Sequence, residues 1–304
     1  MKPFRSLTAI SLASLASASL VFSQDAPVPS KIDLKPETSA TDPSVKLDPT
    51  GKLPSANKED ALVPLQATEQ KAKEMPAALK KLDESQRNQY NTLREEATSY
   101  MRSVRLQESL EKLADAERVV GEPLAEIENL RGAIFTKMRD FPTARGHFEK
   151  SLTLDKESFH PKFNLAELDF VEKKWSAALD SFTKLIAENE ALKKAATSKL
   201  GEEAKEVVER QFDTTTRLMQ FKIMICQTQE KKAADAEKTL ANFGAYDNDS
   251  PAYYFAKAVL AFAAEKKESA EEWISSAKSI YPAEVTEVYV DSLVEMGWLS
   301  TLQQ

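Results

Sequence analysis

Similar residues recur at one fixed spacing in the middle of this chain, and that spacing limits how the chain can fold. Small, aliphatic and aromatic residues match in five pairs: Gly132 and Ala166, Ile134 and Leu168, Phe141 and Trp175, Ala144 and Ala178, and Phe148 and Phe182. The common period is about 34 residues, which is typical of a helix–turn–helix repeat. Each unit of such a repeat buries its apolar face only against a neighbour, so the units must stack. The spacing therefore predicts an all-α stack of helix pairs.

The composition favours helices over strands. Only seven of the 304 residues are glycine, and the hydrophobic share of 42% is compatible with a packed core. Long runs of Ala, Leu, Glu and Lys favour helix. The sequence shows no convincing alternation of β-branched residues, which would indicate strands. We therefore expect an all-α fold.

Residues 1–23 are organised as an export signal peptide. Lys2 and Arg5 precede a weakly apolar segment from Leu7 to Phe22, and signal peptidase is expected to cleave before Gln24. Serines interrupt the segment, and it is shorter than the roughly 20 apolar residues of a membrane span. We therefore expect no stable membrane insertion after cleavage. The mature protein is expected to be exported, either to the periplasm of the cell envelope or outside the cell.

Residues 24–84 are expected to form a disordered, proline-rich linker. This segment holds eight of the 14 prolines of the chain and no aromatic residue. Such a segment cannot bury enough apolar surface to offset the entropy lost on ordering. It is either a spacer that gives a folded domain reach or an unselected leader, and the sequence leaves both open.

Residues 85–304 are predicted to form a helical repeat domain. Apolar residues at helical spacing assign five helix pairs, near 89–121, 125–158, 159–189, 217–243 and 251–282. The interval from Ala178 to Ala236 exceeds one period by about 24 residues. The inserted residues, roughly 187–215, are expected to extend a helix or add one, as a solvated helix or as a projection that binds a partner. Residues 283–299 are predicted to cap the open end of the stack.

Three copies of one residue pattern resemble the repeats of a known protein family. The first run is Leu130 to Phe135 followed by Phe141, Ala144 and Phe148; the second is Asn164 to Glu167 followed by Trp175, Ala178 and Phe182; the third copy runs from Tyr254 to Pro282. This pattern resembles tetratricopeptide repeats of the exported bacterial type. The resemblance implies a helix–turn–helix solenoid of about four to five repeats with a capping helix. It departs at Asp169, where an aromatic residue is expected, and at Met224, where glycine or alanine is expected.

The sequence shows no catalytic, cofactor-binding or metal-binding motif. His147 and His160 are the only histidines and Cys226 the only cysteine, so a Cys/His set for a transition metal cannot be assembled. A glycine-rich phosphate loop and a Gly-x-Ser-x-Gly elbow are both missing. The formal net charge of −7, without a clustered basic face, argues against nucleic-acid binding. We therefore expect a protein that is not an enzyme and has no cofactor, metal or nucleic-acid partner.

The resemblance implies a concave groove lined by the first helix of each repeat. Seven apolar residues are carried over to that surface: Phe163, Phe170, Phe221, Ile225, Phe255, Val259 and Phe262. Asn129, Ala133 and Glu167 are placed there as well. An aromatic groove suits an amphipathic helix or an apolar peptide of a partner protein. The alternative is that these phenylalanines belong to the core or lie under the inserted helix.

Two functions follow as expectations. The first is an exported, non-catalytic scaffold or adaptor that holds a peptide or helix of a partner protein in its concave groove. The alternative is a structural envelope protein whose stacked repeats associate with one another.

Overall fold

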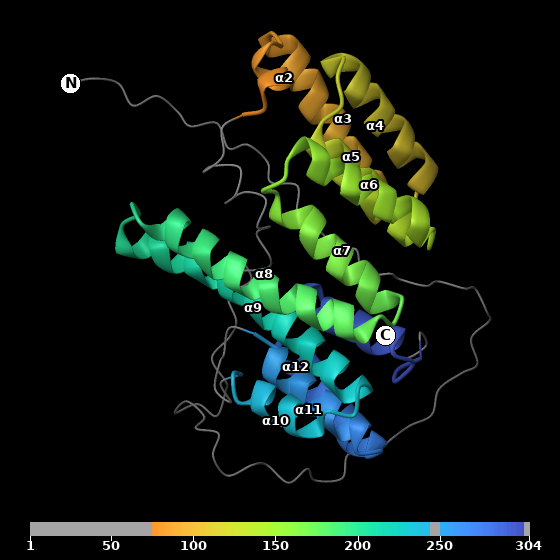
Figure 1. The fold of residues 1–304 in the computed structure, drawn as a ribbon, viewed down its shortest axis with the longest axis vertical. Coiled ribbons are helices and arrows are strands. Elements are labelled where there is room, and N and C mark those ends of the chain that lie inside the picture. Colours follow the sequence, from red (N-terminus) through yellow and green to blue (C-terminus); the bar gives the residue numbers. More distant parts are fainter. Residues whose placement is uncertain (1–74, 244–249, 301–304) are drawn as a thin grey trace.

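The computed structural model describes residues 75–243 and 250–300, and all regular secondary structure in these ranges is helical. Twelve helices follow one another in the described ranges (Figure 1): α2 (Ala77–Lys80), α3 (Glu84–Arg102), α4 (Leu106–Val120), α5 (Ala125–Lys137), α6 (Phe141–Leu154), α7 (Phe159–Val171), α8 (Trp175–Thr197), α9 (Glu202–Gln229), α10 (Ala233–Leu240), α11 (Ala252–Ala263), α12 (Lys267–Ile280) and α13 (Ala283–Glu295). The predicted all-α class is confirmed.

The N-terminal predictions fall mostly outside the described residues. The expected signal peptide, residues 1–23, lies outside them, and so does the expected linker as far as residue 74. The end of that linker, residues 75–84, carries α2 and the start of α3. Asp83 caps α3: its side chain accepts from the backbone of Gln86, whose side chain accepts from the backbone of Asp83. This reciprocal capping box sets where the helix begins.

Neighbouring helices pack in pairs, as the repeat spacing predicts. Helix α3 packs on α4, α5 on α6, α7 on α8, α9 on α10 and α11 on α12. Contacts between successive pairs are less extensive, except that α8 of the third pair packs extensively on α9 of the fourth. None of the helices in the described part of the chain combines the length and apolar character needed to cross a membrane. The architecture is an all-α, repeat-like arrangement of helix pairs.

The turn inside each pair has the same backbone geometry. Five residues occupy the left-handed region with φ between 58° and 61°: Val104, Arg139, Lys173, Lys231 and Glu265. In each turn the next N–H donates to the carbonyl five positions earlier, as Asp140 does to Phe135 at 2.9 Å and Lys174 to Asp169 at 2.8 Å. This is the hydrogen bond that closes a Schellman motif at a helix end. The backbone therefore repeats with the same spacing as the side chains.

Small residues stand where the second helix of each pair approaches the first. Five such residues are fully buried: Ser109, Ala144, Ala178, Ala236 and Ala270. In the second pair, Gly132 of α5 faces the ring of Phe148 of α6. A Cβ atom on Gly132 would lie 2.8 Å from Cζ of that ring and closer still to two other ring atoms. Small against large at this crossing lets the two helices pack closely.

We expect Gly132→Ala and Gly146→Ala to change stability in opposite directions. The added methyl at position 132 collides with the buried Phe148 ring, which should lower the free energy of unfolding by about 1 to 2 kcal/mol. At position 146, on α6, a Cβ meets nothing within 4 Å, so alanine should raise that free energy by roughly 0.5 to 1 kcal/mol. Urea denaturation followed by circular dichroism measures both. Equal shifts at the two positions would contradict the close approach.

The inserted segment extends two helices. Helices α8 and α9 have 23 and 28 residues and form a long hairpin that projects from the rest of the chain (Figure 1). The buried Asn189 holds it together, since its amide donates to the carbonyl of Phe212 at 2.9 Å and to the Thr216 hydroxyl at 3.0 Å. Further out, Lys193 pairs with Asp213 at 2.5 Å. The prediction that the insertion extends a helix is confirmed.

Candidate partner-binding site

The structure places most of the expected groove residues in the core. Five of the seven are at most 1% exposed: Phe170, Phe221, Ile225, Phe255 and Val259. Phe163 and Phe262 are half-buried and pack against the same cluster. This corrects the expectation of an open aromatic groove, because these side chains are already covered by the chain itself.

Part of the cover comes from the last helix, α13, and the residues after it. The Tyr289 ring of α13 stacks on Phe255 at a centroid distance of 5.1 Å and meets Phe221 edge-on at 5.0 Å. Beyond the helix, Gly297 takes a φ of 72°, and the Trp298 ring then stacks on Phe262 at 5.4 Å. The segment that was predicted to cap the end of the stack therefore covers residues that were predicted to line the groove.

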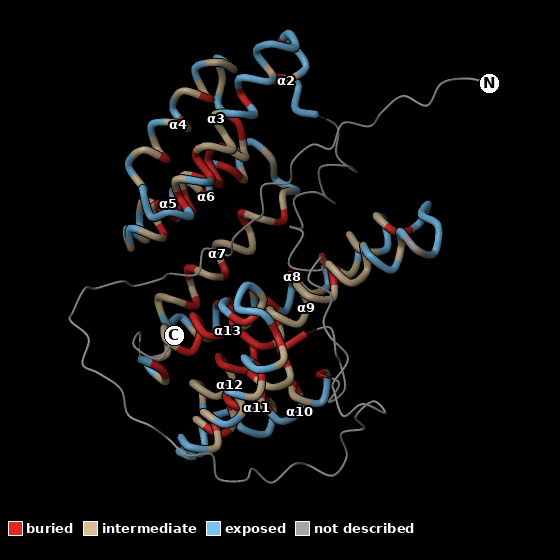
Figure 2. The backbone as a smooth tube through the Cα atoms, turned by 180° about the vertical axis from the view of Figure 1, so that it is seen from behind, coloured by how far each residue is buried: buried red, intermediate tan, exposed pale blue. Residues whose placement is uncertain are grey.

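Helix α13 is enclosed on more than one side. Its residues 288 to 293 are buried without interruption (Figure 2). A helix that buries one face shows buried positions three or four apart, with exposed positions between them. Six consecutive buried positions therefore require neighbours on opposite sides. The neighbours that contact α13 are α9, α11, α12 and the turn between α5 and α6.

A buried lysine joins α13 to the body of the protein. Lys222 of α9 is 6% exposed. Its ammonium group lies 2.9 Å from the carboxylate of Glu167 on α7 and donates to the Ser292 hydroxyl of α13 at 3.0 Å. The same group lies 4.6 Å from the centroid of the Phe170 ring. One cation thus links three helices.

A second ion pair reaches α13 from the distant turn between α5 and α6. The Arg139 guanidinium donates to both carboxylate oxygens of Glu295, each at 3.1 Å. Burial lowers the pKa of the neighbouring Lys137, while the Asp291 and Glu287 carboxylates of α13 act in the opposite direction. Helix α13 thus presents carboxylates to a basic side of the surface that holds it.

The first helices of successive pairs are joined by polar contacts. The Tyr90 hydroxyl of α3 donates to the Glu126 carboxylate of α5. The Asn164 amide of α7 donates to the Asn129 side chain of α5 at 2.9 Å. The pair of Glu167 and Lys222 continues the series from α7 to α9. Polar side chains therefore join α3 to α5, α5 to α7 and α7 to α9.

A fully buried carboxylate organises the second helix pair. Glu128 of α5 is 0% exposed and lies 2.8 Å from Arg131, 2.9 Å from Lys150 and 2.7 Å from Nδ1 of His147. Burial acts to raise the pKa of Glu128, but hydrogen bonds from Lys150 and His147 and the Arg131 charge outweigh it, so the pKa lies below its ordinary value of 4.5. This cluster ties α5 to α6 and leaves the carboxylate ionised at neutral pH.

We expect Glu128→Gln to lower the free energy of unfolding by about 1 to 2 kcal/mol at pH 7, because charge-assisted hydrogen bonds are replaced by neutral ones. The folded-state pKa is depressed, so the carboxylate stabilises the fold above pH 4.5 and loses this effect as the pH falls through the folded value. The difference between wild type and variant should therefore shrink below pH 4.5 in urea titrations. Glu111→Gln, on the exposed side of α4, should change stability by less than about 0.5 kcal/mol. A pH-independent Glu128→Gln effect would contradict this role.

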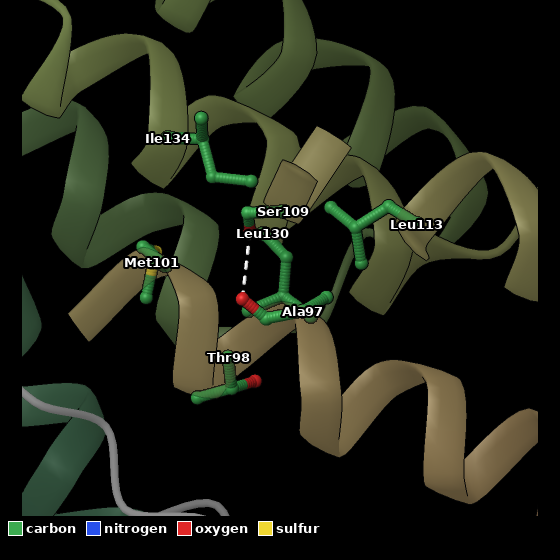
Figure 3. Close-up of a pocket in the computed structure, with 7 residues that line it drawn as sticks. All are labelled: Ala97, Thr98, Met101, Ser109, Leu113, Leu130 and Ile134. Atoms are coloured by element: carbon green, nitrogen blue, oxygen red, sulfur yellow. Dashed lines mark hydrogen bonds between the residues drawn. The ribbon is translucent and has the colours of Figure 1, made fainter. Parts of the chain in front are cut away.

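The hollow between α3, α4 and α5 is part of the core. Seven residues line it (Figure 3): Ala97, Thr98, Met101, Ser109, Leu113, Leu130 and Ile134. The Ser109 hydroxyl donates to the Ala97 carbonyl at 2.7 Å across the hollow, and there is no room for a water molecule. Among the described residues, His, Cys, Asp and Glu side chains do not gather in any group of three or more that could hold a metal ion.

The contacts that hold α13 involve residues for which the sequence carries no local signal. Lys222, Arg139 and Glu295 occupy ordinary helix or turn positions, and their partners belong to other helix pairs, far away along the chain.

No protein-family model and no curated protein sequence matches this chain.

Proposed function

We propose that this chain is an exported, non-catalytic scaffold of the tetratricopeptide type that holds a helical segment of a partner protein on the surface now covered by α13. The repeat spacing and the five equivalent turns support the repeat type. The observation that carries the binding function is that this surface already holds a helix. Tyr289 packs on the aromatic side chains of α9 and α11, and Glu295 pairs with Arg139.

The manner in which α13 is held supports a helix as the ligand. An amphipathic helix is recognised in a groove through apolar anchors at helical spacing, supplemented by polar contacts at the edges. Tyr289 and Leu293 stand one helical turn apart and are 2% and 0% exposed. Ser292 and Glu295 add polar contacts to Lys222 and Arg139. A partner helix of similar size and pattern fits the same surface.

The test is to block this surface without assuming the charge of the partner. A polyethylene glycol maleimide is attached to the Arg139→Cys variant of the mature chain, and to an Arg118→Cys variant as the control. Arg118 lies on α4 with its side chain 78% exposed. The only native thiol, Cys226, is fully buried, and burial raises its pKa to about 12, so it should not react.

Affinity capture from envelope extract of the source organism then compares the two labelled chains. We expect a partner that is retained by the chain labelled at position 118 and lost by the chain labelled at position 139. Equal retention by both would remove this surface from the function. Light scattering of the unlabelled chain alone decides the alternative, because an assembly larger than a monomer would favour self-association.

A further inference from the structure

We propose that the partner presents an acidic amphipathic helix with the chemistry of α13, and that it binds by displacing α13. This inference rests on the function proposed above and names the partner class for the same surface. Helix α13 then acts as an internal competitor. It lowers the apparent affinity for the partner, because only chains in which α13 has left the surface are competent to bind.

The interface of α13 is more polar than that of a neighbouring core helix. Thr286, Asp291 and Ser292 of α13 are only 2 to 8% exposed. Helix α11, by contrast, buries only Ala, Phe and Val side chains. Polar groups are costly to bury without partners, and partners that water can replace are typical of interfaces that form and separate. Helix α13 therefore buries more polar groups than α11 does, and as many as α5, which buries Glu128, Asn129 and Thr136.

The acidic residues of α13 define the charge of the partner. Glu287, Asp291 and Glu295 follow one another at i, i+4 and i+8, so they lie along one side of the helix. Like charges at this spacing destabilise an isolated helix. Here they act on Lys137 and Arg139 of the body, and Glu295 forms the bidentate ion pair. This arrangement selects an acidic helix and disfavours a basic one.

The apolar residues of α13 define the spacing of the anchors. Tyr289 and Leu293 each lie midway between two of the acidic residues in the sequence, two positions from either one. In a helix this spacing places them on the side opposite the carboxylates. That side packs on Phe221 and Phe255. The expected partner helix therefore carries carboxylates at positions 1, 5 and 9, an aromatic residue at position 3 and an aliphatic residue at position 7, as in residues 287–295.

The test uses full-length chains and two fluorescent peptides. One peptide has the sequence of residues 283–299, and the other carries Glu295→Lys. The chains are Glu295→Lys, in which Arg139 repels the internal helix, and Arg139→Glu, in which Glu295 is repelled. Each chain is exposed to both peptides, so any effect of releasing α13 is the same for the two peptides and cancels in the comparison. Arg118→Glu is the control chain.

Fluorescence anisotropy measures the preference of each chain. We expect the Glu295→Lys chain to bind the wild-type peptide about tenfold more tightly than the lysine peptide, and the Arg139→Glu chain to show the reverse preference. Wild-type and Arg118→Glu chains should bind the wild-type peptide more weakly than the Glu295→Lys chain does. Loss of discrimination in either charge-reversed chain, with a native circular dichroism spectrum, overturns the inference. If a charge reversal unfolds the chain, Arg139→Gln and Glu295→Gln replace it, with an expected preference of about threefold.

Failure of the inference and failure of the proposed function give different results. If the peptides are not discriminated but labelling at position 139 still removes the captured partner, the surface binds a partner of other chemistry and only the inference falls. If the peptides are discriminated but the labelling has no effect on capture, the proposed function falls. A wild-type dimer in light scattering would assign the surface to α13 of a second copy and would overturn the partner class proposed here.

Discussion

Replacing Phe255 with alanine is expected to lower the free energy of unfolding by about 3 to 5 kcal/mol. The Phe255 ring is 0% exposed and contacts the rings of Phe221, at a centroid distance of 6.4 Å, and Tyr289, at 5.1 Å. These three rings come from α9, α11 and α13. Truncation removes the ring shared by the three helices, and the backbones cannot close the space without separating other contacts. Urea denaturation followed by circular dichroism measures the loss.

A matched truncation on the same helix tests whether Phe255 is a core residue or a groove residue. Phe262 lies on the same helix, α11, but is half-buried and stacks on Trp298. Phe262→Ala should therefore cost only about 1 to 2 kcal/mol. If Phe255 lined an open groove, the two truncations would cost similar, small amounts. A loss below about 1 kcal/mol for Phe255→Ala would contradict its place in the core.

The sequence pattern predicted the local architecture because that architecture depends on neighbours within one period. Gly132 and Phe148 are separated by less than one period and meet within one helix pair. Gly121 and Gly297 follow helices and take the left-handed conformation, with φ of 77° and 72°, as glycine after a helix does. The insertion near 187–215 kept its helical pattern and became the ends of two helices.

The turns adopt a backbone conformation that the residue pattern does not predict. Val104 and Arg139 take φ values of 58° although neither is glycine or asparagine. This φ is especially unfavourable for the β-branched Val104 on local grounds. The conformation is maintained by the hydrogen bonds of the turn and the packing of the two helices. The two residues that depart from the expected repeat pattern have defined places in the structure. Asp169 pairs with Arg145 at 2.7 Å, and Met224 is fully buried.

The contacts that α13 makes could not be predicted from the sequence because the partner residues are distant in the chain. The pair Arg139 and Glu295, and the contact between Lys222 and Ser292, span 156 and 70 residues. Periodicity reports which face of a helix is apolar, but it does not report which other helix covers that face. The pattern therefore predicts that Phe221 and Phe255 lie on apolar helix faces, but it does not predict that α13 covers them.

Replacing Lys222 with methionine is expected to lower the free energy of unfolding by about 2 to 3 kcal/mol, because removing one partner of a buried ion pair leaves the other uncompensated. The Glu167 side chain is 22% exposed, which moderates the effect. Its Oε1 atom is buried without a hydrogen bond in the described part of the chain, so Lys222 supplies the counter-charge on which this carboxylate depends. Methionine keeps the length of the side chain, so the change reports on charge more than on volume.

A second substitution identifies the cause of that loss. Adding Glu167→Gln to Lys222→Met removes the uncompensated charge and should recover at least half of the lost stability, giving a coupling energy of about 1 to 2 kcal/mol in a double-mutant cycle. Ser292→Ala is the matched control for the other partner of Lys222. The Ser292 hydroxyl also donates to the Val288 carbonyl at 2.9 Å, and its removal leaves the ion pair intact, so the loss should stay below about 1 kcal/mol. Additive effects of the Lys222 and Glu167 changes would mean that the pair contributes nothing of its own. Coupling at Glu167 with a small effect at Ser292 would show that Lys222 stabilises the body of the protein and holds α13 only weakly, which is the balance that a displaceable helix requires.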